Sequence, residues 1–170
     1  MTKGWRVGVA LALLALAGCG TAYSWRGAVP AEMRRVAVPT FRNESDVPEL
    51  GAIAARQLAR EFQREGTFAL AAGEDAALEI QGVIKDARGG TLAYDRRSGL
   101  RLSAHEMMAV AEVSVIDRRR GKVLVDNRIY QANATFTAGQ DETTAKRDAS
   151  GRVLEDLARQ IVDDVLNLKW

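Results

Sequence analysis

Cysteine and histidine are almost absent from this 170-residue chain, which holds one of each. The single cysteine, Cys19, cannot form an internal disulfide, so the folded body must be stabilised by its apolar core. The single histidine, His105, and the lack of H-E-x-x-H and C-x-x-C exclude the usual patterns of zinc and thiol redox sites. The phosphate-binding pattern G-x-x-x-x-G-K-[ST] and the hydrolase pattern G-x-S-x-G are also missing. We therefore expect no enzyme, no metal and no cofactor, and we expect His105 to be an ordinary surface residue.

A large excess of charge of either sign is also missing. The formal net charge is +2, from 24 basic and 22 acidic residues. Two of the basic residues, Lys3 and Arg6, precede Cys19, so residues 19–170 hold 22 residues of each sign. A neutral body lacks the broad positive field on which nucleic-acid binding depends. We therefore expect no nucleic-acid partner.

The N-terminal segment has the parts of a lipoprotein signal peptide. Two early basic residues precede an apolar run over residues 7–17, which is too short to span a bilayer, and the tetrapeptide L-A-G-C ends it. Small residues beside the cysteine leave its thiol open to a lipid-transferring enzyme and the preceding bond open to a peptidase. We predict that residues 1–18 are removed and that Cys19 is acylated, which anchors the chain to a lipid bilayer. Because Gly20 rather than an aspartate follows, we expect the periplasmic face of the outer membrane.

The rest of the chain predicts a tether over residues 19–31 and a single α/β domain over residues 32–170. Apolar residues at helical spacing indicate helices over 47–65 and 150–169, and alternating patterns indicate strands over 33–39, 76–85, 106–116 and 122–137. Residues 67–71 are either a further short strand or an approach to the next one. Packing both helices on one face of a mixed sheet of about four strands buries both apolar stripes. The expected fold is therefore a two-layer α/β (α+β) sandwich.

Several local signals constrain the connections. Gly66 is a C-terminal stop for the first helix, and Gly82 indicates a bulge or a close backbone neighbour. Residues 41–45 are expected to form a polar loop, and residues 117–121 a hairpin turn. Residues 87–104 form either a long loop or two strand extensions joined at Ser98-Gly99.

Several stretches of the mature chain match one family together. They are the lipobox, Y-S-W-R-G at 23–27, V-P at 29–30, R-V-A-V-P-T-F-R-N at 35–43 before a helix, L-E-I-Q-G-V-I at 78–84, and the closing helix that leads to Trp170. Together they resemble the outer-membrane lipopolysaccharide (LPS) assembly lipoprotein family, the small partner of the LPS-exporting β-barrel. The resemblance implies a non-enzymatic component of the outer-membrane LPS translocon, which plugs the barrel, assists its assembly and contacts LPS during insertion into the outer leaflet. Its implied partners are the barrel, LPS and the bilayer.

The sequence also allows an alternative function. The run V-A-V-P-x-F-x-N also resembles the first strand of other envelope lipoproteins, including activators of peptidoglycan synthases. The alternative is therefore an envelope regulator that docks on such a synthase and activates it.

Two basic clusters are candidate contact sites. By the resemblance, Arg96 and Arg97 lie where the family carries a basic loop residue associated with LPS, and the arginine fork matches phosphate. A solvated turn is the other interpretation of this pair. The second cluster, at the tip of the expected hairpin, consists of Arg118, Arg119, Arg120 and Lys122. It would contact lipid phosphates or an acidic barrel lumen, or it serves solubility and protection of the sheet edge.

Overall fold

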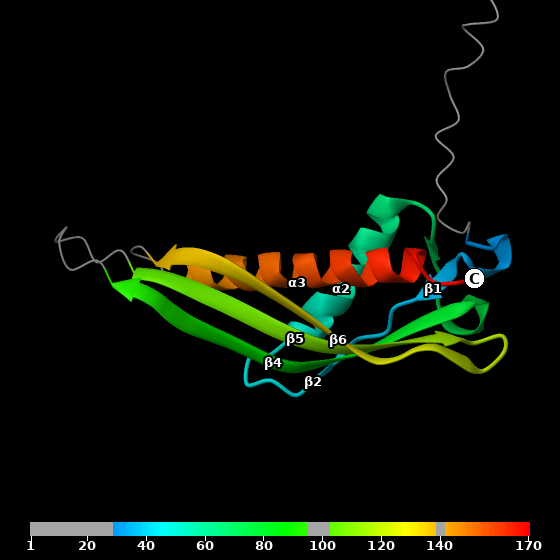
Figure 1. The fold of residues 1–170 in the computed structure, drawn as a ribbon, viewed down its shortest axis with the longest axis horizontal. Helices are drawn as coiled ribbons and strands as arrows, with labels where there is room; N and C mark the ends of the chain where they lie inside the picture. The colour runs from blue at the N-terminus through cyan, green and yellow to red at the C-terminus, as the bar shows by residue number, and fades with distance from the viewer. Residues whose placement is uncertain (1–28, 95–102, 139–141) are drawn as a thin grey trace, which may run out of the picture.

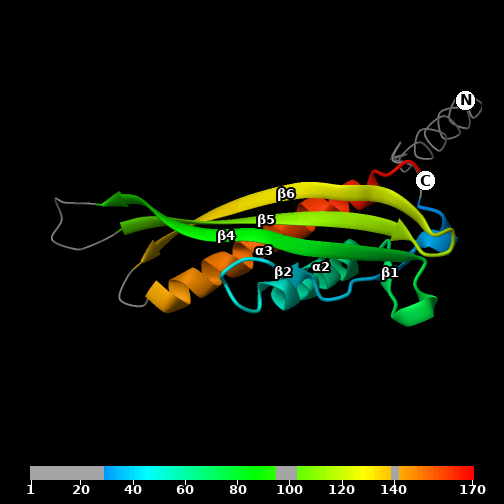
Figure 2. The ribbon, with the colours of Figure 1, turned by 90° about the horizontal axis from the view of Figure 1, so that it is seen from below.

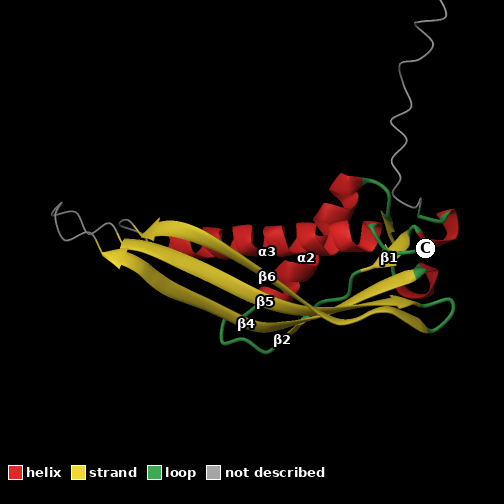
Figure 3. Ribbon diagram, in the orientation of Figure 1, coloured by secondary structure: helices red, strands yellow, loops and turns green. Residues whose placement is uncertain are grey.

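Two long helices lie on one face of a six-stranded mixed sheet in the computed structural model, which describes residues 29–94, 103–138 and 142–170 (Figure 1). The strands are β1 (Arg35–Ala37), β2 (Arg42–Asn43), β3 (Ala69–Leu70), β4 (Leu78–Tyr94), β5 (Ser103–Asp117) and β6 (Lys122–Ala138). The helices are α2 (Leu50–Glu65) and α3 (Glu142–Leu166), and the short 3-10 turns are η1 (Ala31–Met33) and η2 (Gly73–Asp75). The predicted α+β sandwich is confirmed, although its sheet has more strands than the four expected (Figure 3).

The sheet combines a long antiparallel meander with short parallel strands on one side of it. Its order is β3-β1-β4-β5-β6, and β2 also pairs with β4. β1 and β2 run parallel to β4, whereas β4–β5 and β5–β6 are antiparallel hairpin neighbours. β4 and β5 remain paired as far as Tyr94 and Ser103. The strand-extension interpretation of residues 87–104 is therefore correct as far as these two residues, while residues 95–102 lie outside the described part of the chain.

The prediction of a plain polar loop over residues 41–45 is wrong in part. β1 ends at Ala37, and the chain pairs again with the same neighbour, β4, through β2, where Arg42 lies opposite Val83. Pro39 lies in the interruption and has no N–H to donate to a ladder. Pairing resumes beyond the proline because the neighbouring strand β4 continues past this point.

Phe41 explains why glycine stands at two positions that pack against the segment between β1 and β2. Its side chain is 3% exposed, and its ring occupies the space that a Cβ on Gly82 would need. A Cβ on Gly51 would likewise overlap the carbonyl oxygen of Phe41, whose N–H donates to the Gly51 oxygen at 3.3 Å. The register is regular at Gly82, and the close neighbour of this glycine is the Phe41 ring and not the backbone neighbour or bulge that the sequence predicted.

The ends of the helices confirm one prediction and correct another. Gly66 ends α2 with φ +85°, and its N–H donates to the Phe62 oxygen at 3.2 Å. α3 begins at Glu142, eight residues before the predicted start at 150. Ala145 and Ala149 are the apolar residues that its first turns pack against the core, and Ala149 is fully buried. Because alanine is small, those turns carry little apolar signal in the sequence.

The helices lie against one face of the sheet (Figure 2), and one core of buried side chains lies between the two layers. The buried side chains include Leu78, Ile80 and Ile84 from β4, Ala109, Ala111 and Val113 from β5, and Leu58, Phe62, Leu157 and Ile161 from the helices. Small alanines on β5 leave room for the large helix side chains above them. Burial of each large apolar side chain contributes about 1.5–3 kcal/mol.

The outer strand of the meander is fastened to α3 by polar contacts. Asp164 accepts hydrogen bonds from the Tyr130 hydroxyl at 2.8 Å and from Arg128 at 2.7 Å. Gln160 donates to the backbone oxygen of Gln131 at 3.2 Å, so helix side chains also satisfy the strand's outer backbone groups. Burial and the hydrogen bond to Asp164 raise the pKa of Tyr130. These contacts cover part of an edge that would otherwise be open to strand pairing.

Candidate contact surfaces

Several of the predicted site residues lie outside the described part of the chain. Cys19, Arg96 and Arg97 belong to this group, and their roles remain predictions. The paired strand ends at Tyr94 and Ser103 lie at the opposite end of the molecule from the β5–β6 turn (Figures 1 and 2). The two predicted basic clusters therefore belong to connections at opposite ends of the meander.

The β5–β6 turn is held rigidly by a buried carboxylate. Asp117 is 1% exposed, and its Oδ1 accepts the backbone N–H groups of Arg119 at 2.9 Å and Arg120 at 3.1 Å. Gly121 takes the left-handed conformation, with φ +62°. The N–H of Arg118 donates to the Ala77 oxygen at 2.9 Å, which ties the turn to the start of β4. The basic tip is thus a fixed platform for its side chains.

The four cations of this tip are not equivalent. Arg118 pairs with Glu79 at 2.8 Å, and Arg120 lies 3.8 Å from the Oδ2 of Asp117. Arg119 and Lys122 are exposed and form no ion pair with the residues that the structure describes. Two of the four predicted cations, Arg119 and Lys122, therefore carry a charge that no described residue neutralises, while the contact role of the cluster remains a prediction.

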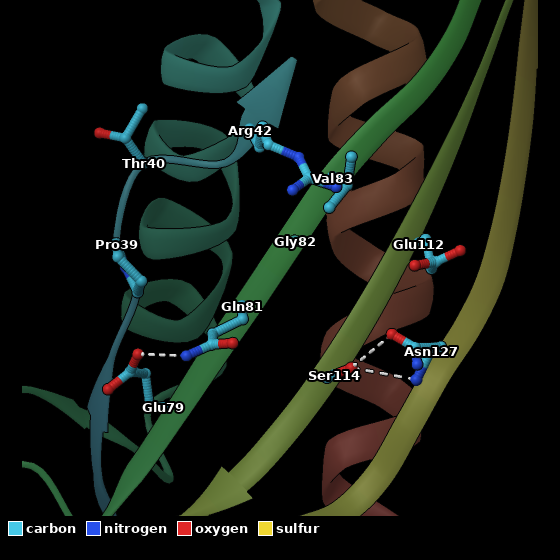
Figure 4. A pocket seen from close by; sticks show the side chains of 10 residues that line it. All are labelled: Pro39, Thr40, Arg42, Glu79, Gln81, Gly82, Val83, Glu112, Ser114 and Asn127. Atoms are coloured by element: carbon cyan, nitrogen blue, oxygen red, sulfur yellow. Dashed lines mark hydrogen bonds between the residues drawn. The ribbon is translucent and has the colours of Figure 1, made fainter. Parts of the chain in front are cut away.

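A polar pocket of about 370 Å³ lies on the open face of the sheet, which the helices do not cover (Figure 4). Its walls come from the β1–β2 connection, from β2, and from β4, β5 and β6; they comprise Pro39, Thr40, Arg42, Glu79, Gln81, Gly82, Val83, Glu112, Ser114 and Asn127. Gln81 donates to Glu79 at 2.8 Å, and Glu79 is the same carboxylate that binds Arg118. The pocket therefore adjoins the basic tip through a shared acid.

A β-bulge shapes one wall of this pocket. Asn127 has φ +44°, and its N–H donates to the Ser114 hydroxyl at 3.0 Å. The strand register shifts here, between Val113 and Val115. The pocket's groups are hydrogen-bond donors and acceptors suited to contact with a polar surface. Sequence reasoning missed this pocket because its walls come from segments far apart in the chain.

An exposed ion pair lies at the sheet edge near the same face. Lys85 Nζ lies 2.6 Å from Glu44, and this hydrogen bond is the main reason that the pKa of Glu44 is lowered and that of Lys85 raised.

The single histidine, His105, stacks on Phe136 with ring centroids 5.2 Å apart. Within the described ranges, no three His, Cys, Asp or Glu side chains gather as metal ligands would. Nor does any helix there offer a stretch long and apolar enough to cross a membrane.

Comparison with protein families gives one match. The family model described as LptE, Lipopolysaccharide-assembly, matches residues 33–167. This range includes all six strands and both long helices. No curated protein matches the sequence.

Comparison with solved structures shows a shared fold. A hypothetical protein from Chlamydia trachomatis is 16% identical with a TM-score of 0.54, over 79% of this chain and 96% of that one. A protein from Xanthomonas campestris is 12% identical with a TM-score of 0.51, over 81% and 88% of the two chains. A minor lipoprotein from Acinetobacter baumannii is 13% identical with a TM-score of 0.47, over 79% and 93%. At such identities, the first two similarities indicate the fold alone.

Proposed function

This chain belongs to the LptE lipopolysaccharide-assembly family, and from that premise we propose that it is the lipoprotein component of the outer-membrane LPS translocon. In this role the protein sits in the lumen of the LPS-exporting β-barrel, assists its assembly and contacts LPS on its way to the outer leaflet. It works by surface complementarity and not by catalysis. The observation that carries the proposal is the family match over residues 33–167, which covers the whole sheet and both helices.

The anchor sets the orientation in this proposal. Acylated Cys19 precedes Val29 by ten residues, which span at most about 35 Å when fully extended. Val29 is 4% exposed, and its carbonyl oxygen accepts a hydrogen bond from Arg34 at 3.0 Å, so the tether meets the body at a fixed point. That point lies at the same end as the β5–β6 turn (Figures 1 and 2). Arg119 and Lys122 at this tip then contact anionic groups near the inner leaflet, while Arg118 and Arg120 support the tip.

The open face of the sheet is the proposed contact with the barrel wall. It carries Gln81, Glu112 and Ser114 in neighbouring strands, and Ile129 is 66% exposed there. The interiors of outer-membrane barrels are polar, so a polar face with one apolar contact residue suits such a wall. Arg96 and Arg97, in the connection between β4 and β5, are the proposed contacts for LPS phosphates.

Co-purification tests the barrel partnership. We expect the acylated protein, extracted from native cells in mild detergent, to bring down a large β-barrel in equal amount. The variant Ile129→Asp should lose most of this barrel, whereas Gln63→Asp, on the exposed side of α2, should keep it. Recovery of a peptidoglycan synthase in place of a barrel would instead support the alternative function.

A pull-down with LPS tests the second contact. The double variant Arg96→Asp/Arg97→Asp should lose most LPS binding at unchanged thermal stability. Arg60→Asp/Arg64→Asp makes the same change of charge on the surface of α2 and should retain binding. Equal LPS recovery with wild type and both variants would remove Arg96 and Arg97 from the proposed site.

A further inference from the structure

A second cavity, of about 600 Å³, lies between the two helices on the other side of the molecule from the open face. Its walls are the start of α2 with the residues before it and the second and third turns of α3; they comprise Val47, Pro48, Glu49, Leu50, Ile53, Arg56, Lys146, Arg147, Ser150 and Gly151. The size is within the range of about 300–1,000 Å³ that is typical of small-molecule sites. We call this cavity the interhelical groove.

The floor of the groove is apolar and preformed. Leu50 is 2% exposed, and Val47 and Ile53 pack against the core. The loop that carries Val47 is fixed, because the Asn43 side chain donates to its carbonyl oxygen at 2.7 Å. The hydroxyl of Ser150 donates to the Lys146 oxygen at 2.9 Å, so this polar group is already satisfied. An apolar chain entering the groove therefore leaves none of these groups without a partner.

The rim of the groove carries three cations and one acid. Arg56, Lys146 and Arg147 are exposed and form no ion pair with any residue in the described ranges. Two other arginines on the helices are paired, Arg64 with Glu61 at 2.6 Å and Arg159 with Glu155 at 2.8 Å. With Glu49 as the only acid in the lining, the rim has a formal charge of +2.

We propose that the interhelical groove binds lipid A, with one acyl chain on the apolar floor and the two phosphates at the cationic rim. The formal charge of +2 favours a headgroup with two phosphates over the single phosphodiester charge of a phospholipid. Arginine pairs with phosphate bidentately, and lysine contributes a compact positive charge. This site rests on the proposed function, since it assumes that the protein meets LPS, and it adds a place for the acyl chain that Arg96 and Arg97 do not provide.

Gly151 offers a test that leaves the charges unchanged. A Cβ built on this glycine meets no atom within 4 Å, and Gly151 lines the cavity, so a side chain added here starts from open space at the cavity wall. The variant Gly151→Phe should fill the groove and lower lipid A binding at least tenfold. Lys146→Glu/Arg147→Glu should cause a similar loss by reversing the rim charge, and it tests the site independently if Gly151→Phe fails to fold.

Photo-crosslinking of the full acylated protein in detergent is the direct measurement. A photoreactive amino acid at position 150 should crosslink to lipid A, and one at Gln63, on the exposed surface of α2, should not. Bis-phosphorylated lipid A should crosslink more strongly than monophosphoryl lipid A, and phosphatidylglycerol should fail to compete. Equal competition by phosphatidylglycerol, or a crosslink that survives both Gly151→Phe and Lys146→Glu/Arg147→Glu, would overturn the proposal.

The same variants separate the groove from the proposed function. Gly151→Phe should leave barrel co-purification unchanged, because the groove lies on the helix layer and not on the open face of the sheet. Lipid A crosslinking without any barrel partner would refute the plug and retain the groove. A barrel partner without crosslinking at position 150 would refute the groove alone.

Discussion

The two faces of the meander belong to the same three strands, but the residues on one face are restricted by packing and those on the other are not. On the covered face, Ile80 and Ile84 are fully buried, and Ala109 and Ala111 are almost fully buried beneath the helices. On the open face, Ile129 is 66% exposed. Packing dictates the first set, because a change of volume there is felt directly. Packing does not restrict the exposed residues of the open face in this way, so those residues are available for recognition of a partner.

The bulge at Asn127 keeps the two faces distinct. Val125 and Tyr130 are both buried although they are five positions apart, an odd spacing that strict alternation would place on opposite faces. The extra residue in β6 shifts the alternation by one position. Tyr130 therefore faces α3, where its hydroxyl donates to Asp164. A local irregularity thus preserves the division between a packed face and an open one.

The largest contrast should come from truncating one apolar residue in the core above the covered face and one on the open face. Phe62 is fully buried, and its ring meets Phe68 edge to face with centroids 5.3 Å apart. We expect Phe62→Ala to lower the free energy of unfolding by about 3–5 kcal/mol. Ile129→Ala should change it by less than about 0.5 kcal/mol. Urea denaturation measures both, and similar losses for the two variants would refute the contrast.

Two glycine-to-alanine substitutions test the contrast between packed and open positions, because each adds a single methyl group. Gly82→Ala drives a Cβ into the Phe41 ring, and we expect a loss of about 1–3 kcal/mol. Gly90→Ala, in the same strand, meets no atom within 4 Å and should be close to neutral. The double variant Gly82→Ala/Phe41→Leu should show coupling, because the two residues share one space. Additive losses in that cycle would contradict the proposed contact.

A smaller effect is expected where a polar contact links the meander to α3. Tyr130→Phe removes the hydrogen bond to Asp164 while keeping the ring, and it should cost about 1 kcal/mol. In Asp164→Asn the raised pKa of Tyr130 should move back toward its ordinary value, as measured by ultraviolet absorbance of the phenolate. An unchanged titration would mean that burial alone sets this pKa.

The smallest effect belongs to the exposed pair at the sheet edge. Lys85 lowers the pKa of Glu44 mainly by its hydrogen bond, so the pair stabilises the fold above the ordinary glutamate pKa and loses this contribution as the pH falls through the lowered value. In Lys85→Met the Glu44 carboxyl should titrate at higher pH, which nuclear magnetic resonance can follow. Solvent screens this pair, so the midpoint of thermal unfolding should barely move. A Glu44 titration identical in both proteins would rule out the pairing.

Local patterns in the sequence predicted the meander and its turn well. The alternation of Leu78, Ile80 and Ile84 identified β4, and Gly66 correctly ended α2. β2 was missed because its two residues form a strand only by lying beside β4, which comes later in the chain. The early turns of α3 were missed because Ala145 and Ala149 carry little apolar signal.

The candidate site was less predictable than the fold. The basic tip was expected, but the pairing of Arg118 with Glu79 joins residues 39 positions apart and only the folded hairpin brings them together. The open-face pocket and the interhelical groove are likewise built from distant segments. The roles of Cys19, Arg96 and Arg97 remain predictions from the sequence.

The turn closed by Asp117 also bears on how the chain reaches its final form. It joins β5 to β6 through four residues, so that hairpin can zip up from its own tip within microseconds. The parallel pairs of β1 and β2 with β4 must instead wait until the intervening helix has formed and the long loop has closed. The C-terminal ribbon therefore forms early, before the sheet is complete. The N-terminal strands β1 and β2 dock last and complete the sheet.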